Sequence, residues 1–247
     1  MKKLVVFVDG QNFFYTLQNL GLSLENINLQ NFFSHLIDKS HLDKNKIELI
    51  RVSWYQVRDV FPQTLEYKIL RNYISNDCSR NPNSYQFKQH EVFEKDNTGN
   101  FKIDLNSEME KRIKWIEEQN KKIRFTQDKS QKVALEYPRI EFVKIGNLKV
   151  NPYAMEIKGE KGVDVGIAVD LIQKSDYFDI AFIISGDADL SPAIKHIKDK
   201  LKLVYITRFF KGHPPTTRGS SEDIRTIADE VIDLYTSEFE SAGIIIK

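Results

Sequence analysis

Four aspartates in this sequence have a type and spacing that could together hold a divalent cation: Asp9, Asp164, Asp187 and Asp189. Carboxylates packed together repel one another, and their pKa values rise unless a cation lies among them. A cluster with only oxygen ligands suits Mg²⁺ or Mn²⁺, which favour carboxylates and water over imidazole or thiolate. Such an ion commonly binds a phosphate and activates water for in-line attack. The cluster therefore predicts metal-dependent hydrolysis of a phosphate ester.

Two apolar runs, residues 4–8 and 180–184, are interpreted as buried strands that carry these carboxylates to one edge of a sheet. Asp9 directly follows the first run, and Asp187 follows the second. In open α/β sheets, ligands bind beyond the carboxyl ends of the strands. Asp164 lies near the start of an apolar predicted helix, and a helix begins at the edge where the strands that feed it end. We therefore expect the acidic segments to converge.

Apolar runs and amphipathic segments alternate along most of the chain. Continuous apolar runs predict buried strands at residues 4–8 and 180–184, and further strands are predicted at residues 47–55, 139–145 and 203–207. Helical spacing of apolar residues predicts helices at residues 12–20, 29–37, 65–74, 163–172, 190–200 and 222–235. Strands and helices at these intervals predict an α/β fold, with a mainly parallel central sheet and helices on both of its faces.

The middle of the chain, residues 56–138, differs from this pattern. Residues 85–92 and 101–103 flank a turn-forming segment and predict a hairpin. The next stretch, residues 107–132, is rich in Glu, Lys and Arg and predicts an exposed helix. We predict a single domain, residues 1–247, in which the middle segment is an insertion that forms a hairpin plus helix outside the main sheet.

Each aspartate also has a structural interpretation. Asp9 could belong to an ordinary turn, because a glycine follows it. Asp187 or Asp189 could cap the helix that follows, and Asp164 could complement the dipole of its own helix. Isolated turns and caps need not place their carboxylates at one sheet edge. The expected position of all four aspartates at the same edge therefore favours a shared site.

The charge of the chain is nearly balanced, with 36 Lys and Arg against 35 Asp and Glu, a formal net charge of +1. Attraction of a polyanion must therefore come from local patches. Five basic residues are predicted to bind substrate near the acidic edge: Lys158, Lys161, Arg208, Lys211 and Arg218. Residues 209–221 are interpreted as a basic loop. Within it, Phe209 and Phe210 could stack on the bases of a single strand or could belong to the core.

Other features of the sequence exclude several alternatives. Cys78 is the only cysteine, so the chain can form neither an internal disulfide nor a thiolate metal cluster. The first apolar run is too short for a signal peptide, and no apolar stretch is long enough to span a bilayer. We therefore expect a cytoplasmic protein without a membrane partner.

Three blocks of this sequence resemble the signature motifs of a known nuclease family. They are Val-Phe-Val-Asp-Gly-Gln-Asn at 6–12, Lys-Gly-Val-Asp-Val at 161–165 and Ile-Ser-Gly-Asp-Ala-Asp-Leu at 184–190. These blocks resemble those of NYN domains in the PIN-like nuclease superfamily, and the best match is the LabA-like branch. The resemblance covers about residues 1–55 and 139–236, whereas the middle segment matches no motif.

The resemblance implies a PIN-like three-layer α/β/α fold and a Mg²⁺- or Mn²⁺-dependent endonuclease, with RNA as a more usual substrate than DNA. By motif, the four aspartates correspond to the acidic ligands of the metal. Asn12 corresponds to the polar residue beside the first acid, and Ser185 to a hydroxyl that lines the site.

Two other functions stay open at this stage. A non-catalytic NYN module could keep the fold and bind RNA or a protein partner, although the presence of all four acids favours the enzyme. A phosphohydrolase of nucleotides would instead need a deep, closed pocket. The sequence also leaves open whether copies of the chain form a homo-oligomer.

Overall fold

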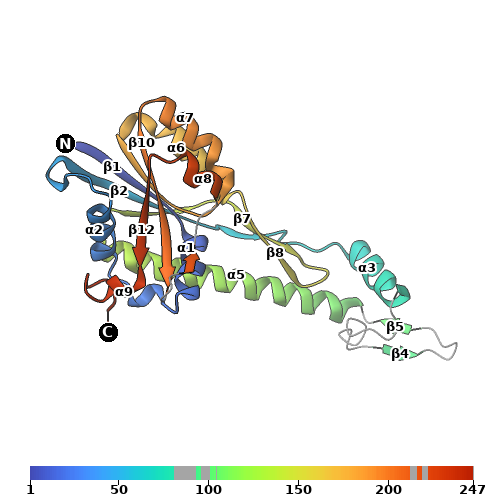
Figure 1. The fold of residues 1–247 in the computed structure, drawn as a ribbon. Helices are drawn as coiled ribbons and strands as arrows, with labels where there is room; N and C mark the ends of the chain where they lie inside the picture. Colours follow the sequence, from blue (N-terminus) through green and yellow to red (C-terminus); the bar gives the residue numbers. More distant parts are fainter. Residues whose placement is uncertain (81–92, 96–100, 104, 212–215, 219–221, 247) are drawn as a thin grey trace. The chain divides into compact units, whose positions relative to one another are not determined.

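The computed structural model describes residues 1–80, 93–95, 101–103, 105–211, 216–218 and 222–246 (Figure 1). These residues divide into two compact units. Unit 1 comprises residues 1–57, 127–146 and 162–247, and unit 2 comprises residues 58–126 and 147–161. All four aspartates of the predicted site belong to unit 1, so that unit holds the candidate site.

Unit 1 is built on a seven-stranded sheet. Six of its strands run parallel in the order β12-β10-β9-β1-β2-β6, and a short strand, β11, pairs antiparallel with the end of β10. The strands are β1 (Lys2–Asp9), β2 (Ile47–Gln56), β6 (Ile140–Lys144), β9 (Ile180–Ile184), β10 (Leu203–Lys211), β11 (Thr216–Arg218) and β12 (Glu230–Tyr235).

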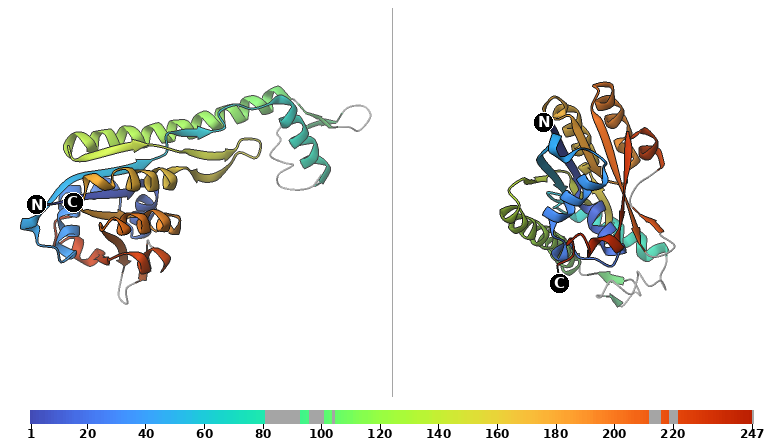
Figure 2. Two further views of the ribbon diagram at one scale, coloured as in Figure 1. Left: turned by 90° about the horizontal axis from the view of Figure 1, so that it is seen from above. Right: turned by 60° about the vertical axis from the view of Figure 1, so that its left-hand side comes forward.

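Helices cover both faces of this sheet (Figures 1 and 2). One face packs on α1 (Gly10–Asn19), α2 (Leu29–Lys39) and α9 (Thr236–Phe239), and the other on α6 (Val163–Gln173) and α7 (Ser191–Asp199). Because strand side chains alternate between faces, Val6 of β1 belongs to the first core, whereas Phe7 makes an edge contact with Phe178 on the α6 side. The predicted three-layer α/β/α arrangement is confirmed.

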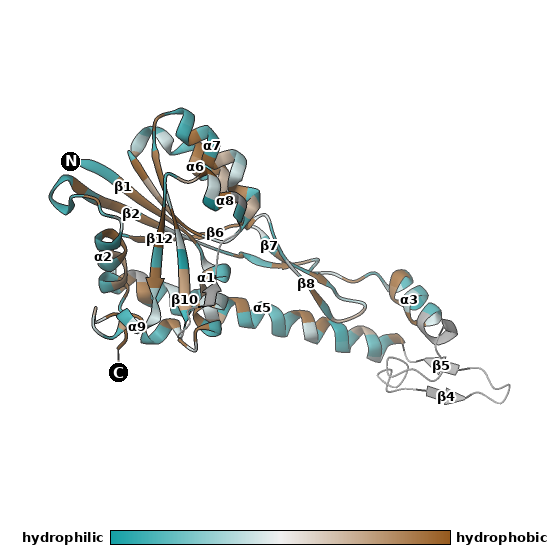
Figure 3. Ribbon diagram, viewed as in Figure 1, coloured by the Kyte–Doolittle hydropathy of each residue, from teal (hydrophilic) through white to brown (hydrophobic). Residues whose placement is uncertain are grey.

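Short elements complete unit 1. An additional helix, α8 (Glu222–Ile227), lies beside α7. The 3-10 turns are η1 (Leu24–Asn26), η2 (Lys44–Lys46), η3 (Ser175–Tyr177) and η4 (Ala188–Leu190). Figure 3 shows hydrophobic residues concentrated in the central strands, as expected for parallel strands buried on both faces.

Unit 2 contains a three-stranded sheet in the order β3-β7-β8 and a separate two-stranded hairpin of β4 and β5. Its elements are β3 (Asp59–Phe61), α3 (Tyr67–Arg80), β4 (Phe93–Lys95), β5 (Phe101–Ile103), β7 (Asn147–Asn151), β8 (Glu156–Lys161) and most of α5 (Leu105–Glu136). Among the described residues of 85–132, none contributes a strand to the seven-stranded sheet. The first arm of the predicted hairpin, residues 85–92, lies outside the described residues.

The C-terminal part of the chain corrects two predictions. The helix predicted at 222–235 is wrong, because it ends at Ile227 and β12 follows. Pairing with β10 overrides helical propensity here: Ile232 and Leu234 are buried in the sheet core, and the Asp229 carboxylate accepts a hydrogen bond from the Val204 N–H at 2.7 Å.

The basic loop predicted at 209–221 is wrong at residues 209–211 and 216–218, and its other residues lie outside the described part of the chain. Strand β10 continues to Lys211, and β11 pairs with its last residues. Phe209 and Phe210 are the physical reason, because burying their rings keeps the chain extended. The sequence pattern also missed β7 and β8, whose polar composition is not typical of strands.

Candidate active site

Strand pairing brings the first and last acidic blocks together. Strands β1 and β9 are parallel neighbours, and the pair Val8 and Ile184 places Asp9 beside Ser185 at the carboxyl edge of the sheet. The Asp9 carboxylate accepts hydrogen bonds from the Asn12 N–H at 2.9 Å and from the Ser185 hydroxyl at 3.4 Å. The prediction that the two strands are parallel and adjacent is confirmed.

Hydrogen bonds continue from Asp9 along the loop after β9. The Asp187 N–H donates to the Ser185 hydroxyl oxygen at 3.2 Å, and the Asp189 N–H donates to the Asp187 carboxylate at 2.9 Å. Asp9 and Asp187 are therefore also the N-caps of α1 and η4. Asp189 does not cap α7, whose N-cap is Leu190 without a side-chain hydrogen bond.

The Asp9 carboxylate is in an unusual electrostatic environment. Its side chain is almost fully enclosed, with 7% relative exposure. Burial, followed by the negative charges of Asp164 and Asp187, raises the pKa of Asp9 to about 6, against the lowering effect of the hydrogen bonds from Asn12 and Ser185. The charges of Asp164 and Asp187 therefore both act on the Asp9 carboxylate.

This donor set fits a hard divalent cation in its chemistry. Carboxylate oxygens are what Mg²⁺ and Mn²⁺ prefer, and a cation would offset the repulsion that raises the pKa of Asp9. Across the described part of the chain, however, no three His, Cys, Asp or Glu side chains are arranged as a ready-made metal site.

Helix α6 holds Asp164 in its first turn. The helix follows Gly162, whose φ of 89° lies in the left-handed region that favours glycine. A Cβ atom on Gly166 would lie 2.5 Å from the Ile145 side chain, so α6 packs closely against the residue after β6. These glycines bring the start of α6, and with it Asp164, to the edge of the sheet.

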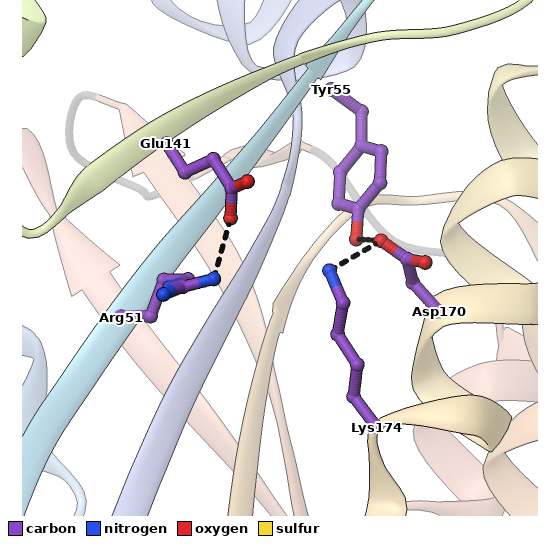
Figure 4. A network of polar contacts seen from close by, with 5 residues as sticks. All are labelled: Arg51, Tyr55, Glu141, Asp170 and Lys174. Atoms are coloured by element: carbon purple, nitrogen blue, oxygen red, sulfur yellow. Dashed lines mark hydrogen bonds and ion pairs between the residues drawn. The ribbon is translucent and has the colours of Figure 1, made fainter.

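A polar network fastens α6 to the sheet (Figure 4). The Tyr55 hydroxyl donates to the Asp170 carboxylate at 2.6 Å, and Lys174 binds the same carboxylate oxygen at 2.7 Å. Burial and the bond to Asp170 raise the pKa of Tyr55. The exposed pair Arg51 and Glu141 joins β2 to β6 at 2.9 Å. The sequence pattern did not single out Tyr55, because only the pairing of β2 with β1 places it near α6.

Gly10 is required where the chain leaves Asp9. A Cβ atom at this position would lie 2.4 Å from the Trp54 Nε1 atom and 2.5 Å from the Tyr55 carbonyl oxygen. Gly10→Ala is expected to lower the free energy of unfolding by about 1–3 kcal/mol, because neither neighbour can give way without disturbing β2. Urea unfolding compares the free energy of unfolding of Gly10→Ala with that of Gly159→Ala. Gly159 has no atom within 4 Å of its Cβ position, although its φ of 105° means that alanine there is also strained. Equal stability of Gly10→Ala and wild type would contradict the packing argument.

The predicted basic residues lie on several different elements of the fold. Arg208 forms a two-pronged ion pair with Asp233 at 2.7 and 2.6 Å and lies over the Phe210 ring at 5.2 Å. Lys211 donates to the Asn19 carbonyl oxygen at 3.3 Å. Phe209 and Phe210 are buried, which supports their core interpretation over base stacking.

The other three basic residues lie elsewhere. Lys158 and Lys161 belong to β8 in unit 2, where Lys158 pairs with Glu156 at 2.5 Å. Arg218 is in β11, and its side chain lies outside what the structure describes.

The three-layer fold and the acidic edge define an α/β protein with a polar site at the carboxyl ends of its strands. A model of the NYN domain family matches residues 111–235, just over half of the chain. The chain therefore belongs to the NYN domain family, which is part of the PIN-like nuclease superfamily. The matched residues include Asp164, Asp187 and Asp189 but begin beyond Asp9.

Other comparisons are sparse. No curated protein matched the chain. One solved structure, a protein of unknown function from Vibrio parahaemolyticus, is 15% identical with a TM-score of 0.46, and the likeness covers 94% of this chain and 93% of that one. Within the described residues, no helix is both long and apolar enough to cross a membrane.

Proposed function

We propose that this chain is a divalent-metal-dependent endonuclease that hydrolyses phosphodiester bonds of RNA. One observation carries the proposal. In a chain of the NYN family, the buried carboxylate of Asp9 has a raised pKa, and Asp164 and Asp187 contribute to that rise. Carboxylates that share such an environment are poised to accept a cation, and perturbed acids of this kind cluster at functional sites.

In this proposal Asp9, Asp164 and Asp187 hold Mg²⁺ or Mn²⁺, with Asp189 as the fourth acid. The bound ion would polarise a phosphoryl oxygen and lower the pKa of water. The protein itself would orient the carboxylates of Asp9 and Asp187. The Asn12 N–H and the Ser185 hydroxyl hold the two oxygens of Asp9, and the Asp189 N–H holds Asp187. Hydrogen bonds thus fix the direction of the Asp9 and Asp187 carboxylates, and each of the two can still offer a lone pair to a cation.

Several finer assignments belong to the same proposal. The motif blocks at 6–12, 161–165 and 184–190 support placement in the LabA-like branch. The preference for RNA over DNA follows from that resemblance, and so does the choice of Mg²⁺ or Mn²⁺. A cytoplasmic location is supported by the single cysteine, which leaves no internal disulfide to form.

A second candidate function is a non-catalytic NYN module that binds RNA or a protein partner. Two observations favour it. The described acids are not arranged as a ready-made metal site, and the carboxylates of Asp9 and Asp187 already serve as helix caps. In this alternative the aspartates stabilise the fold without binding a cation.

Incubation with end-labelled RNA and DNA in Mn²⁺, in Mg²⁺ and in EDTA separates the two functions. We expect internal cleavage of RNA that needs either metal and stops completely in EDTA, because the carboxylates alone cannot activate water at neutral pH. An Asp9→Asn sample purified in the same way controls for contaminating nucleases. Intact RNA in both metals, from protein shown by its thermal melt to be folded, would favour the non-catalytic module.

A further inference from the structure

Helix α1 starts at the candidate active site, because its N-cap is Asp9. One side of this helix, which includes Phe13 and Leu17, packs in the core of unit 1. Phe14 and Tyr15 lie outside that core and are 41% and 54% exposed. With a rise of about 1.5 Å per residue, they lie about 8 and 9 Å along the helix from Asp9. The acidic edge of the sheet thus has two exposed aromatic rings beside it.

The rings of Phe14 and Tyr15 form one surface. Their centroids are 6.0 Å apart in an edge-to-face arrangement. Apolar side chains that are exposed singly are normal on a protein and need no explanation. Two exposed rings in contact are instead typical of a binding surface, and open ring faces of this kind stack on nucleobases.

Two amide side chains, Gln11 and Gln18, flank the aromatic pair. Each is three residues from one ring and four from the other, so the four side chains share one face of α1. Gln18 is exposed and Gln11 is partly exposed, and within the described part of the chain neither amide makes a hydrogen bond. An amide offers both donors and an acceptor, as the edges of nucleobases do. This face of α1 therefore matches both the faces and the edges of bases.

The composition of α1 favours bases over phosphates as its ligand. None of its ten residues is Asp, Glu, Lys or Arg, although these types make up 29% of the chain. Phosphate groups are bound mainly by Lys and Arg, so this face is not built to bind a nucleic-acid backbone. In a duplex, base faces are stacked and base edges are paired, so only unpaired nucleotides offer both to a protein.

We propose that this face of α1, formed by Gln11, Phe14, Tyr15 and Gln18, binds the bases of unpaired nucleotides next to the bond that is cut. Phe14 and Tyr15 stack on the bases, and the two glutamines bond to base edges. The position beside the cut bond rests on the proposed nuclease function, whereas base binding itself does not. The face selects single-stranded RNA over duplex RNA.

Binding of fluorescently labelled single-stranded RNA, followed by anisotropy in EDTA, tests this face without cleavage. Phe14→Ala and Tyr15→Ala should each weaken binding roughly fivefold or more, and Tyr15→Phe should bind like wild type because it keeps the ring. The dependence of affinity on salt should not change in these variants, since no phosphate contact is lost. Tyr177→Ala is the matched control, because Tyr177 is 72% exposed but precedes β9 and so lies at the opposite ends of the strands.

A single-stranded RNA whose central nucleotides lack their bases isolates the stacking contact. Wild type should bind this abasic RNA more weakly than the intact strand. The double variant Phe14→Ala with Tyr15→Ala should no longer distinguish the two RNAs. Thermal melts check that the double variant is folded, which its exposed positions lead us to expect. In Mn²⁺, wild type should cleave the single strand at least about tenfold faster than the same sequence in a duplex.

The outcomes separate base binding from cleavage. Unchanged binding by the double variant, an equal loss in Tyr177→Ala, or tighter binding of the duplex would each overturn the base-binding face. Absence of RNA binding by folded wild type would also overturn it and would favour a protein partner for this face. If wild type cleaves RNA while the double variant binds and cleaves equally well, the nuclease stands and the base-binding face fails. If the double variant selectively loses binding while no protein cleaves in either metal, the face stands and the nuclease fails.

Discussion

Replacing Asp9 by asparagine is expected to lower kcat/KM for RNA cleavage by roughly a thousandfold or more, because the variant loses a charged metal ligand. The same change should stabilise the metal-free protein at neutral pH. Asparagine can still accept the capping hydrogen bond from the Asn12 N–H, so the start of α1 is kept. The variant therefore separates the chemistry of the site from its structure.

The pH dependence of wild-type stability fixes the direction of the predicted change in stability. Because the pKa of Asp9 is raised to about 6 in the folded chain, the folded state holds a proton that the unfolded state has lost between about pH 4 and pH 6. Wild-type stability should fall as the pH rises through this window and then stay lowered at pH 7. The penalty at pH 7 is up to about 3 kcal/mol and is absent at pH 4. Asp9→Asn should therefore be more stable than wild type at pH 7 but not at pH 4.

Thermal melts at the two pH values, in EDTA and in Mn²⁺, measure both halves of the prediction. Mn²⁺ should raise the melting temperature of wild type, since a ligand that binds only the folded state stabilises it, and should leave Asp9→Asn unchanged. Lys2→Ala serves as a control at the far ends of the strands. A destabilised Asp9→Asn protein at pH 7, or full Mn²⁺-dependent cleavage by a folded one, would refute the role assigned to this carboxylate.

Replacing Arg112 by alanine is expected to destabilise unit 2 by about 3–5 kcal/mol, because it removes the cationic half of a buried ion pair. Arg112 and Glu108 are one helical turn apart in α5, and each side chain is only 2% exposed. The guanidinium forms an ion pair with the Glu108 carboxylate and donates to the Tyr153 carbonyl oxygen at 2.9 Å. These contacts join α5 to the turn between β7 and β8.

Hydrogen exchange monitors this effect in each unit separately. Amides at 105–126 in α5 should lose protection in Arg112→Ala, whereas those of β1 in unit 1 should change much less. Arg124→Ala removes an exposed arginine from the same helix and should change stability by no more than about 0.5 kcal/mol. The double variant Glu108→Gln with Arg112→Met should recover part of the loss. Undiminished protection of α5 in Arg112→Ala would mean that the pair does not hold unit 2 together.

The sequence alone determined the central strands and the acidic edge. Residues 4–8 and 180–184 are apolar at every position, which is typical of parallel strands buried on both faces, and this pattern is local. The aspartates follow directly in the chain, so the sheet rule for ligands is enough to predict that Asp9 and Asp187 meet. Strands β1 and β9 are indeed neighbours, and the charge of Asp187 reaches Asp9.

Only the tertiary structure decided the contacts of residues outside these central strands and their acidic ends. Residues 230–235 have helical spacing of apolar side chains, yet they form β12 because β10 offers an unpaired edge. Arg208 was predicted to bind substrate, and only the tertiary structure shows that Asp233 from that same strand forms an ion pair with it. Lys195 looks like any exposed helix residue in the sequence, and only the packing of α7 against α8 places it in a cavity. Strand identity follows from local hydrophobicity, whereas ion pairs and cavities depend on segments distant in the chain, which no local pattern records.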